Sequence, residues 1–180
     1  RRHTNFSMES IEQTWNGTSA GASGVNGRCT ATISRNGDLV SRMYLEIQII
    51  GGSTTSVQNP MATAIDNIEL EIGGQRIDKQ TKQWNQIWAD LTTPESKAAG
   101  FKCMTGACGN SNVNVVGQVQ VPLNFWFCRN PGLALPLIAL QYHEVKLKCV
   151  WGAAAGTRKV LCDYIYLDTD ERRRFAQVSH

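Results

Sequence analysis

The sequence predicts an all-β fold, an antiparallel eight-stranded jelly-roll sandwich with a short inserted helix. Its strand-like segments alternate apolar and polar residues, which is the pattern of strands with one buried face. Strands and helices do not alternate along the chain as a parallel sheet requires. The 180 residues include 16 glycines and 18% charged residues, a balance that favours one β-rich domain over a helical bundle. An immunoglobulin-like sandwich remains an alternative, although its Cys…Trp…Cys signature is not evident.

The first part of the chain is expected to form four strands and a hairpin. The four strands span Phe6–Trp15, Arg28–Ser34, Leu39–Ile50 and Ile65–Ile72. Asn36-Gly37 predicts a tight turn between the second and third strands, because such residues tolerate positive φ. Gly73-Gly74 predicts a hairpin turn that leads into a short strand over Gln75–Asp78.

The segment Lys79–Leu91 breaks the strand pattern and predicts one amphipathic helix. Its large apolar residues recur at three- and four-residue spacing, namely Trp84, Ile87, Trp88 and Leu91. We expect the two tryptophans to pack in the core or in an interface rather than to form a stacking platform for a ligand.

The rest of the chain alternates irregular segments with three strands. Residues 97–112 are expected to form a loop, and the prolines of residues 122–136 argue against a regular central strand there. The strands are expected over Val113–Val121, His143–Trp151 and Val160–Asp168, with a short helical turn at 137–141. The charged run Asp168–Arg174 favours a solvated linker, although its opposite charges also suit pairing across an interface.

Composition excludes several classes of function. The net charge is only +3 and its basic residues are scattered, which argues against a nucleic-acid-binding face. No apolar stretch reaches the roughly 18 residues that a transmembrane helix needs, and we expect no signal peptide because the first residues are polar. The six cysteines are therefore expected to be reduced, in a protein made in the cytosol.

No catalytic, cofactor-binding or metal site is predicted. The three histidines, His3, His143 and His180, are far apart in the sequence, so a cupin-type metal site is not supported. We interpret His143 as a structural hydrogen-bonding residue. Cys103 and Cys108 lack two further ligands nearby, which makes a disulfide a better interpretation than a metal site.

Two other pairs of residues resemble functional motifs. Glu69 and Glu71 face the same way on one strand, and we interpret them as a solvated strand face rather than a catalytic carboxylate pair. Asn5 and Asn16 begin glycosylation motifs, which are coincidental in a cytosolic chain. Nucleophile elbows, Walker loops and HExxH motifs are absent from the sequence.

Five segments of the sequence are similar to one known family. The longest is FWFCRNPGLALPLIALQYHEVKL, and the five together span Thr4–Gly17, Ile33–Leu45, Ile68–Lys79, Phe125–Leu147 and Asp163–His180. In these segments the chain closely resembles the major capsid proteins of nucleocytoplasmic large DNA viruses. The resemblance extends over nearly the whole chain and keeps the order of the family. The loop at residues 100–114 shows no motif of that family.

The resemblance implies a domain organisation. Members of the family fold as two successive jelly rolls, and the present chain matches the first. Residues 1–170 are then the first jelly-roll domain, and residues 171–180 begin a linker toward a second jelly roll that is not present in this chain.

The resemblance also implies a function. It predicts a structural virion protein without enzymatic activity or cofactors, which forms the icosahedral capsid of a large double-stranded DNA virus. Expected partners are the two other copies of a homotrimer, neighbouring capsomers, and minor capsid or cement proteins, close to an internal viral membrane and without direct nucleic-acid binding. The protein is expected to be made in the host cytoplasm and to reside in the virion.

Two segments are expected to make packing or trimer contacts, the helix around Trp84 and Trp88 and the apolar segment Pro122–Pro136. Three alternatives stay open: a minor capsid protein, a carbohydrate- or receptor-binding single jelly roll, and a jelly-roll enzyme, whose histidine cluster is missing here. Fold alone does not decide among them.

Overall fold

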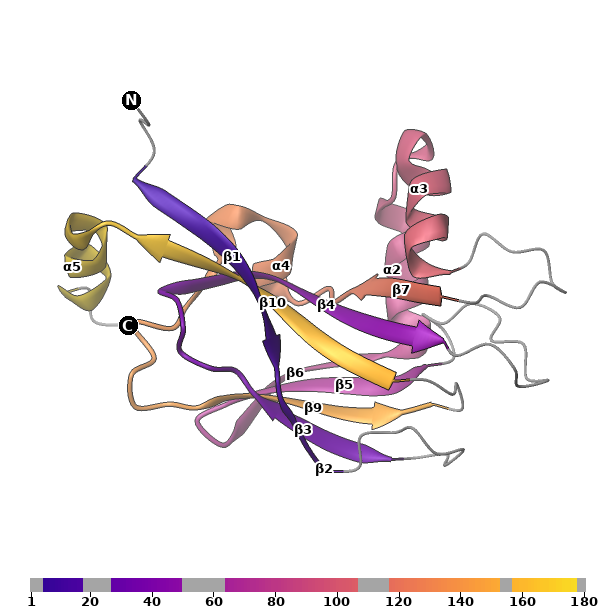
Figure 1. Ribbon diagram of the computed structural model, residues 1–180, viewed down its shortest axis with the longest axis horizontal. Helices are drawn as coiled ribbons and strands as arrows, with labels where there is room; N and C mark the ends of the chain where they lie inside the picture. The colour runs from indigo at the N-terminus through magenta and orange to yellow at the C-terminus, as the bar shows by residue number, and fades with distance from the viewer. Residues whose placement is uncertain (1–4, 18–26, 50–63, 107–116, 153–156, 178–180) are drawn as a thin grey trace, which may run out of the picture.

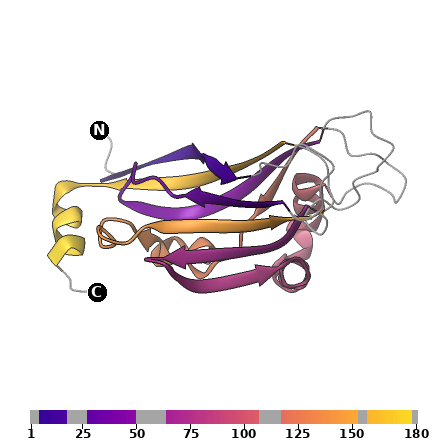
Figure 2. The same cartoon turned by 90° about the horizontal axis from the view of Figure 1, so that it is seen from below.

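The computed structural model describes residues 5–17, 27–49, 64–106, 117–152 and 157–177. Two antiparallel sheets face each other and form a sandwich (Figures 1 and 2). The first sheet, sheet A, has the order β1-β10-β4-β7, and the short strand β8 also pairs with β4. Its strands are β1 (Phe6–Gln13), β10 (Thr157–Leu167), β4 (Leu39–Ile49), β7 (Gly117–Pro122) and β8 (Leu135–Pro136). The predicted all-β antiparallel sandwich is confirmed.

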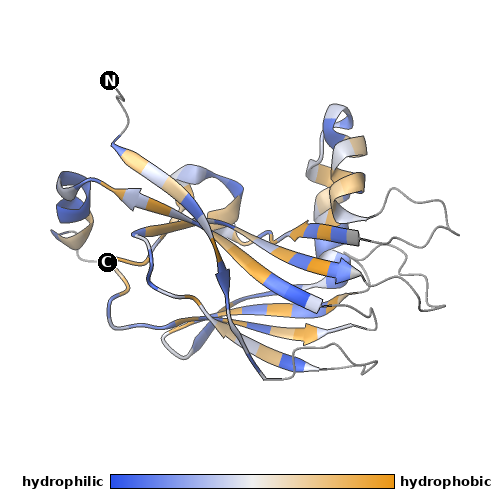
Figure 3. Cartoon of the chain, viewed as in Figure 1, coloured by the Kyte–Doolittle hydropathy of each residue, from blue (hydrophilic) through white to orange (hydrophobic). Residues whose placement is uncertain are grey.

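Sheet B has the order β2-β3-β9-β5-β6. Its strands are β2 (Trp15–Gly17), β3 (Arg28–Thr32), β9 (Val145–Trp151), β5 (Ile65–Ile72) and β6 (Gln75–Thr81). Apolar and polar residues alternate along these strands (Figure 3). The alternation is complete in β9, where Val145, Leu147, Cys149 and Trp151 are buried and the residues between them are not. Burial of one face of each sheet therefore accounts for the core.

The predicted first strand, Phe6–Trp15, is in fact two strands in different sheets. The chain leaves sheet A after Gln13 and enters sheet B at Trp15. The Gln13 side chain is buried, and its Oε1 accepts hydrogen bonds from the Ser34 backbone N–H (2.8 Å) and the Ser34 hydroxyl (2.9 Å). Trp15 then packs edge-on against Trp151, with ring centroids 5.0 Å apart. A continuous polar–apolar pattern does not reveal such a crossing.

The hairpin at Gly73-Gly74 is confirmed. The two glycines have φ of +59° and +83°, a left-handed conformation that side chains disfavour. Strand β6 continues beyond the predicted Asp78 to Thr81, so helix α2 (Lys82–Thr92) begins three residues later than expected. Thr81 caps this helix, because its hydroxyl accepts a hydrogen bond from the Trp84 backbone N–H.

The prediction of a loop over residues 97–112 is wrong for the described residues. Glu95–Thr105 form helix α3, which Gly106 ends in a left-handed conformation with φ of +80°. The helix has only a weak apolar stripe, so periodicity did not reveal it. Cys103 lies exposed on this helix, while Cys108 falls outside the described residues. The structure therefore does not test whether these two cysteines are reduced, as expected, or form the disulfide that is the alternative.

The part of the chain that the structure describes contains four α-helices instead of the single one predicted. The apolar segment at 122–136 contains helix α4 (Trp126–Arg129), a 3₁₀ turn (Pro131–Leu133) and β8. Phe125 and Phe127 of this segment are fully buried and stack on each other. The segment therefore packs in the core, which is one of the two roles expected for it, the other being a trimer contact.

The charged run after the last strand is helical. Helix α5 spans Thr169–Gln177, whereas a solvated linker was expected over Asp168–Arg174. Asp168 begins it, because its carboxylate accepts a hydrogen bond from the Thr169 N–H (2.7 Å) and its carbonyl accepts one from the Arg172 N–H (3.0 Å). Acidic residues in the first turn and an arginine in the last suit the helix dipole.

Candidate assembly interface

The residues with potential chemistry lie apart from one another. His143 is exposed, its carbonyl accepts a hydrogen bond from Arg35, and its ring lies against Gly73. His3 and His180 fall outside the described residues. Among the described residues, no three His, Cys, Asp or Glu side chains gather in a way that could hold a metal ion. In the same ranges no helix is long and apolar enough to cross a membrane.

The two strand carboxylates, Glu69 and Glu71, are each engaged in ion pairs. Glu69 lies 3.3 Å from the Lys79 ammonium and 3.6 Å from the Arg76 guanidinium. Glu71 pairs with Lys148 on the neighbouring strand β9. Ion pairs of this exposed kind each stabilise a fold by less than about 1 kcal/mol. Both carboxylates therefore face basic side chains of neighbouring strands, as expected for a solvated strand face.

Three of the cysteines lie in the core. Cys29 and Cys149 lie opposite each other on β3 and β9, and Cys162 lies on β10. Burial raises the pKa of the Cys149 and Cys162 thiols well above the usual range. Burial also raises the pKa of Cys128, on α4, to about 12. Thiols that stay protonated are poor nucleophiles and poor ligands, so Cys128, Cys149 and Cys162 behave as small apolar residues.

Helix α2 points its apolar stripe away from the core. Asn85 and Ala89 are its buried residues, whereas Trp84, Ile87 and Leu91 are 41%, 50% and 77% exposed. We call these last three residues the outward α2 face. Core packing of the stripe, one of the two expected roles, is therefore excluded for these side chains. An apolar face with a tryptophan at its edge is typical of a protein–protein contact.

The tryptophans of α2 hold each other and the neighbouring helix in place. The Trp84 and Trp88 rings lie with centroids 5.7 Å apart. The Arg129 guanidinium, at the end of α4, lies 4.2 Å from the centroid of the Trp88 ring, within cation–π distance. Trp88 is half-buried and links α2 to α4. The outward α2 face is thus presented on a helix whose inner side is fixed.

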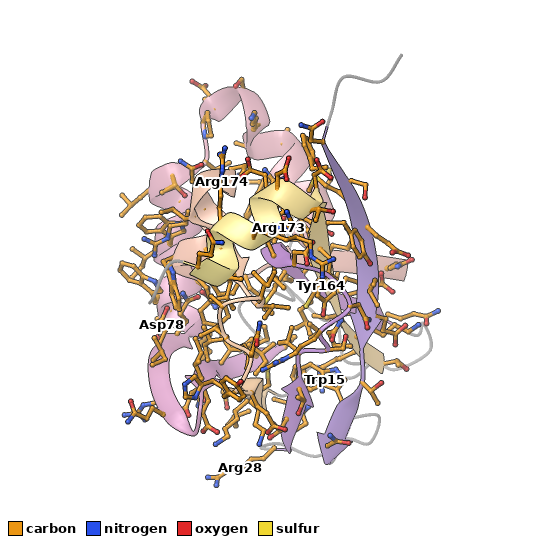
Figure 4. The ribbon with its side chains drawn as sticks, turned by 90° about the vertical axis from the view of Figure 1, so that its left-hand side faces the viewer. Trp15, Arg28, Asp78, Tyr164, Arg173 and Arg174 are labelled. Atoms are coloured by element: carbon orange, nitrogen blue, oxygen red, sulfur yellow. The ribbon has the colours of Figure 1, made fainter. Side chains whose placement is uncertain are left out.

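Helix α5 is fastened at the opposite end of the sandwich from α2 and α3 (Figure 1). Asp38, largely buried, accepts hydrogen bonds from the Leu167 backbone N–H (2.8 Å) and pairs with the Arg172 Nε (3.0 Å). Arg173 and Arg174 lie on the same helix, which faces the viewer in Figure 4. The sequence alone does not indicate this contact, because only the fold brings residues 38 and 172 together.

Comparisons with known proteins give one consistent result. A family model described as "Major capsid protein N-terminus" matches residues 1–156. The major capsid protein of Pyramimonas orientalis virus is 48% identical over the whole of this chain, which covers 49% of that protein. The major capsid protein of Paramecium bursaria Chlorella virus 1 is 41% identical over the whole chain, with 44% of its own length covered. The chain spans about half the length of the curated relatives it matches.

Solved structures agree in fold. A quasi-atomic model of the PBCV-1 virus capsid superposes with a TM-score of 0.82 and 40% identity, over 99% of this chain and 46% of that one. The Faustovirus major capsid protein superposes with a TM-score of 0.67 over 97% of this chain. Its identity is only 9%, so this second likeness concerns the fold alone. On the family match and these identities, the chain belongs to the family of major capsid protein N-terminal domains.

Proposed function

We propose that this chain is the first sandwich of a major capsid protein and that copies of it build the shell of a large DNA virus. The observation that carries the proposal is the outward α2 face, an apolar surface without a role inside the sandwich, in a chain 40% identical to a protein of an assembled capsid. The role is structural, without catalysis. Residues 1–170 form the first jelly roll, and residues 171–180 begin the connection to a second.

The physical basis of shell building is a rigid unit with fixed contact surfaces. Two sheets pack around a continuous apolar core, so the sandwich resists deformation. Lateral contacts between such units are large and well packed, and apolar burial supplies most of their free energy while charge pairs set the register. Three copies form a pseudo-hexagonal capsomer, and capsomers tile the icosahedral shell of the virion.

The outward α2 face supplies a contact between copies in the trimer. Tryptophan is enriched among the residues that dominate binding energies, and a helix surface holds its side chains in defined positions. Trp84, Ile87 and Leu91 follow one another on one side of α2, so an apolar surface of a neighbouring copy can cover them together. Minor capsid proteins and an internal viral membrane are further partners in the shell. Synthesis takes place in the host cytoplasm.

Native mass spectrometry of the protein released from virions tests this proposal. We expect a chain two to three times heavier than 19.9 kDa, detected as a complex of three copies. A 19.9 kDa monomer would contradict both the domain organisation and the assembly. Copy number in the particle separates a major from a minor capsid protein. Glycan binding by a species that does not assemble laterally would instead favour a carbohydrate-binding module.

A further inference from the structure

The bend between β3 and β4 contains the dipeptide Asn36-Gly37 and lies at the end of the sandwich that carries α5 (Figure 1). The Asn36 side chain is exposed, and its Nδ2 donates a hydrogen bond to the Ser34 hydroxyl at 3.0 Å. Among the described residues, the Gly37 backbone N–H donates no hydrogen bond. The Asn36 amide is therefore open to water, and the backbone nitrogen that follows it is not engaged.

Glycine at position 37 is required by packing against β10. Gly37 does not adopt the left-handed conformation, so its backbone angles do not demand glycine. A Cβ atom at this position would lie 2.8 Å from the Cβ of Tyr164, which is fully buried in the core. Such a close approach of backbone to a side chain selects glycine. The fold thus keeps the residue after Asn36 free of a side chain, and with it removes the steric barrier to ring closure at Asn36.

We propose that Asn36 is a site of spontaneous deamidation, which loosens helix α5 as the protein ages. The Gly37 backbone nitrogen attacks the Cγ of Asn36, and a cyclic imide closes as the Cγ–Nδ2 bond breaks. The proton of the Gly37 nitrogen leaves with the side-chain amine as ammonia. Water then opens the ring at either carbonyl and produces aspartate or isoaspartate at position 36. The inference concerns a modification of this chain and does not depend on the proposed function.

The bend leads directly to the residue that fastens α5. Asp38 accepts a hydrogen bond from the Leu167 backbone N–H at 2.8 Å and pairs with the Arg172 guanidinium at 3.0 Å. The backbone of Asp38 is fixed as well, because its N–H donates a hydrogen bond to the Ile165 carbonyl at 3.1 Å. Both sets of contacts require Asp38 to keep its position, and that position depends on the path of the chain through Asn36.

Both products of deamidation disturb these contacts. Isoaspartate carries the main chain through its side chain, so it lengthens the chain by one carbon atom just before Gly37. Packing against Tyr164 leaves Gly37 no free space to absorb that length, so the added atom displaces Asp38. Each product also places a new carboxylate in the pocket of about 190 Å³ that Asn36 shares with Asp38 and Arg172. This carboxylate competes with Asp38 for the arginine and weakens the ion pair that holds α5.

The chain contains two other Asn-Gly dipeptides, one of which serves as an internal control. Asn26 falls outside the described residues. Asn16-Gly17 lies in strand β2, where Asn16 is opposite Thr30 of β3. Ring closure requires the asparagine to leave the extended conformation, so Asn16 reacts only when β2 opens locally. Asn36 lies in a bend outside the strands and needs no opening of a sheet.

The test incubates the full-length protein in neutral buffer at physiological temperature. Peptide mass spectrometry measures deamidation at each asparagine over time, and protein isoaspartyl methyltransferase with a labelled methyl donor detects isoaspartate. Ion-exchange chromatography separates the modified chains, which carry additional negative charge, and hydrogen exchange then compares α5 in the modified and unmodified chains. Asn36→Gln keeps the amide but must close a larger and less favourable ring, and Asn16→Gln is the matched control.

We expect Asn36 to deamidate at least about tenfold faster than Asn16, because even a small free energy of opening in β2 slows its reaction by that factor. Hydrogen exchange in α5 should be faster in chains modified at position 36, with exchange in β9 unchanged. Asn36→Gln should abolish the faster exchange, and Asn16→Gln should leave it unchanged.

The inference is overturned if Asn36 stays unmodified while an unfolded peptide of the same sequence deamidates, or if Asn16 reacts as fast as Asn36. Equal exchange of α5 in modified and unmodified chains would overturn it as well. The same holds if α5 loosens equally in Asn36→Gln, since the loosening would then have another cause. The unmodified protein supplies the rates and the comparison of α5, so the test does not depend on the folding of a variant.

Discussion

Replacing Leu91 by aspartate tests the outward α2 face directly. Leu91 is 77% exposed, so the substitution removes no buried side chain from the sandwich. Full burial of a leucine is worth about 1.5–3 kcal/mol, so covering the exposed part in a contact contributes about 1–2 kcal/mol. An unpaired carboxylate in the same place adds a desolvation cost of at least about 1 kcal/mol. Each contact between copies should therefore weaken by about 2–3 kcal/mol.

A trimer contains three equivalent contacts, so the loss of association free energy per trimer is three times the loss per contact. We expect the Leu91→Asp trimer to dissociate at protein concentrations at least about a hundredfold higher than the unmodified protein, as measured by sedimentation velocity over a dilution series. The thermal unfolding midpoint of the dissociated chain should stay unchanged. The matched control is Gln86→Asp, which adds the same charge at an exposed position on another side of α2. If Leu91→Asp and Gln86→Asp trimers dissociate at the same concentration, α2 is not a trimer contact and the reasoning fails.

Three further predictions concern the sandwich itself. Cys149 and Cys162 should resist alkylation at pH 8 in the folded protein and react within minutes in denaturant, because burial raises the pKa of both thiols. Mass spectrometry measures the alkylation, and rapid labelling of the folded protein would contradict the placement of these cysteines in the core. Burial raises the pKa of Tyr164 to about 12, so the unfolded state loses the proton first and the free energy of unfolding should fall as pH rises from about 10 to about 12. Urea titrations at several pH values should show a shallower fall in Tyr164→Phe. Asp38→Asn removes the carboxylate charge beside Arg172 and should cost about 1–3 kcal/mol locally, seen as faster hydrogen exchange in α5 with unchanged exchange in β9.

Sequence periodicity predicts strands well where one face is buried and neither end crosses between layers. Strand β9 is the clearest case, because its inward residues are all apolar and its outward residues mostly charged. Periodicity does not predict features that depend on tertiary contacts, such as the point at which the chain passes from one sheet to the other. The crossing after Gln13 lies within a single polar–apolar pattern. The hydrogen bond that accompanies it joins Gln13 to Ser34, twenty-one residues away.

The helices show the same limit. Helix α2 was predicted from its apolar spacing, but spacing does not say whether the stripe faces the core or a neighbour. The structure places Ala89 inward and Leu91 outward. Helix α3 was missed because its weak stripe carries little information, although Glu95 after Pro94 and the terminal Gly106 fit a helix start and end. The candidate interface could be located from sequence as a segment, whereas its orientation required the structure.

The pairing of β1 with β10 has a consequence for how the protein is made. Phe6 pairs with Leu167, and Gln13 with Val160, so β1 leaves the ribosome long before its partner β10 has been made. Strand β4 also lacks its β10 neighbour until then. Contacts of such long sequence separation close slowly. During that interval the nascent chain exposes unpaired strand edges next to apolar side chains, a state prone to aggregation. Efficient production of this protein should therefore depend on molecular chaperones and on low temperature more than its final stability suggests.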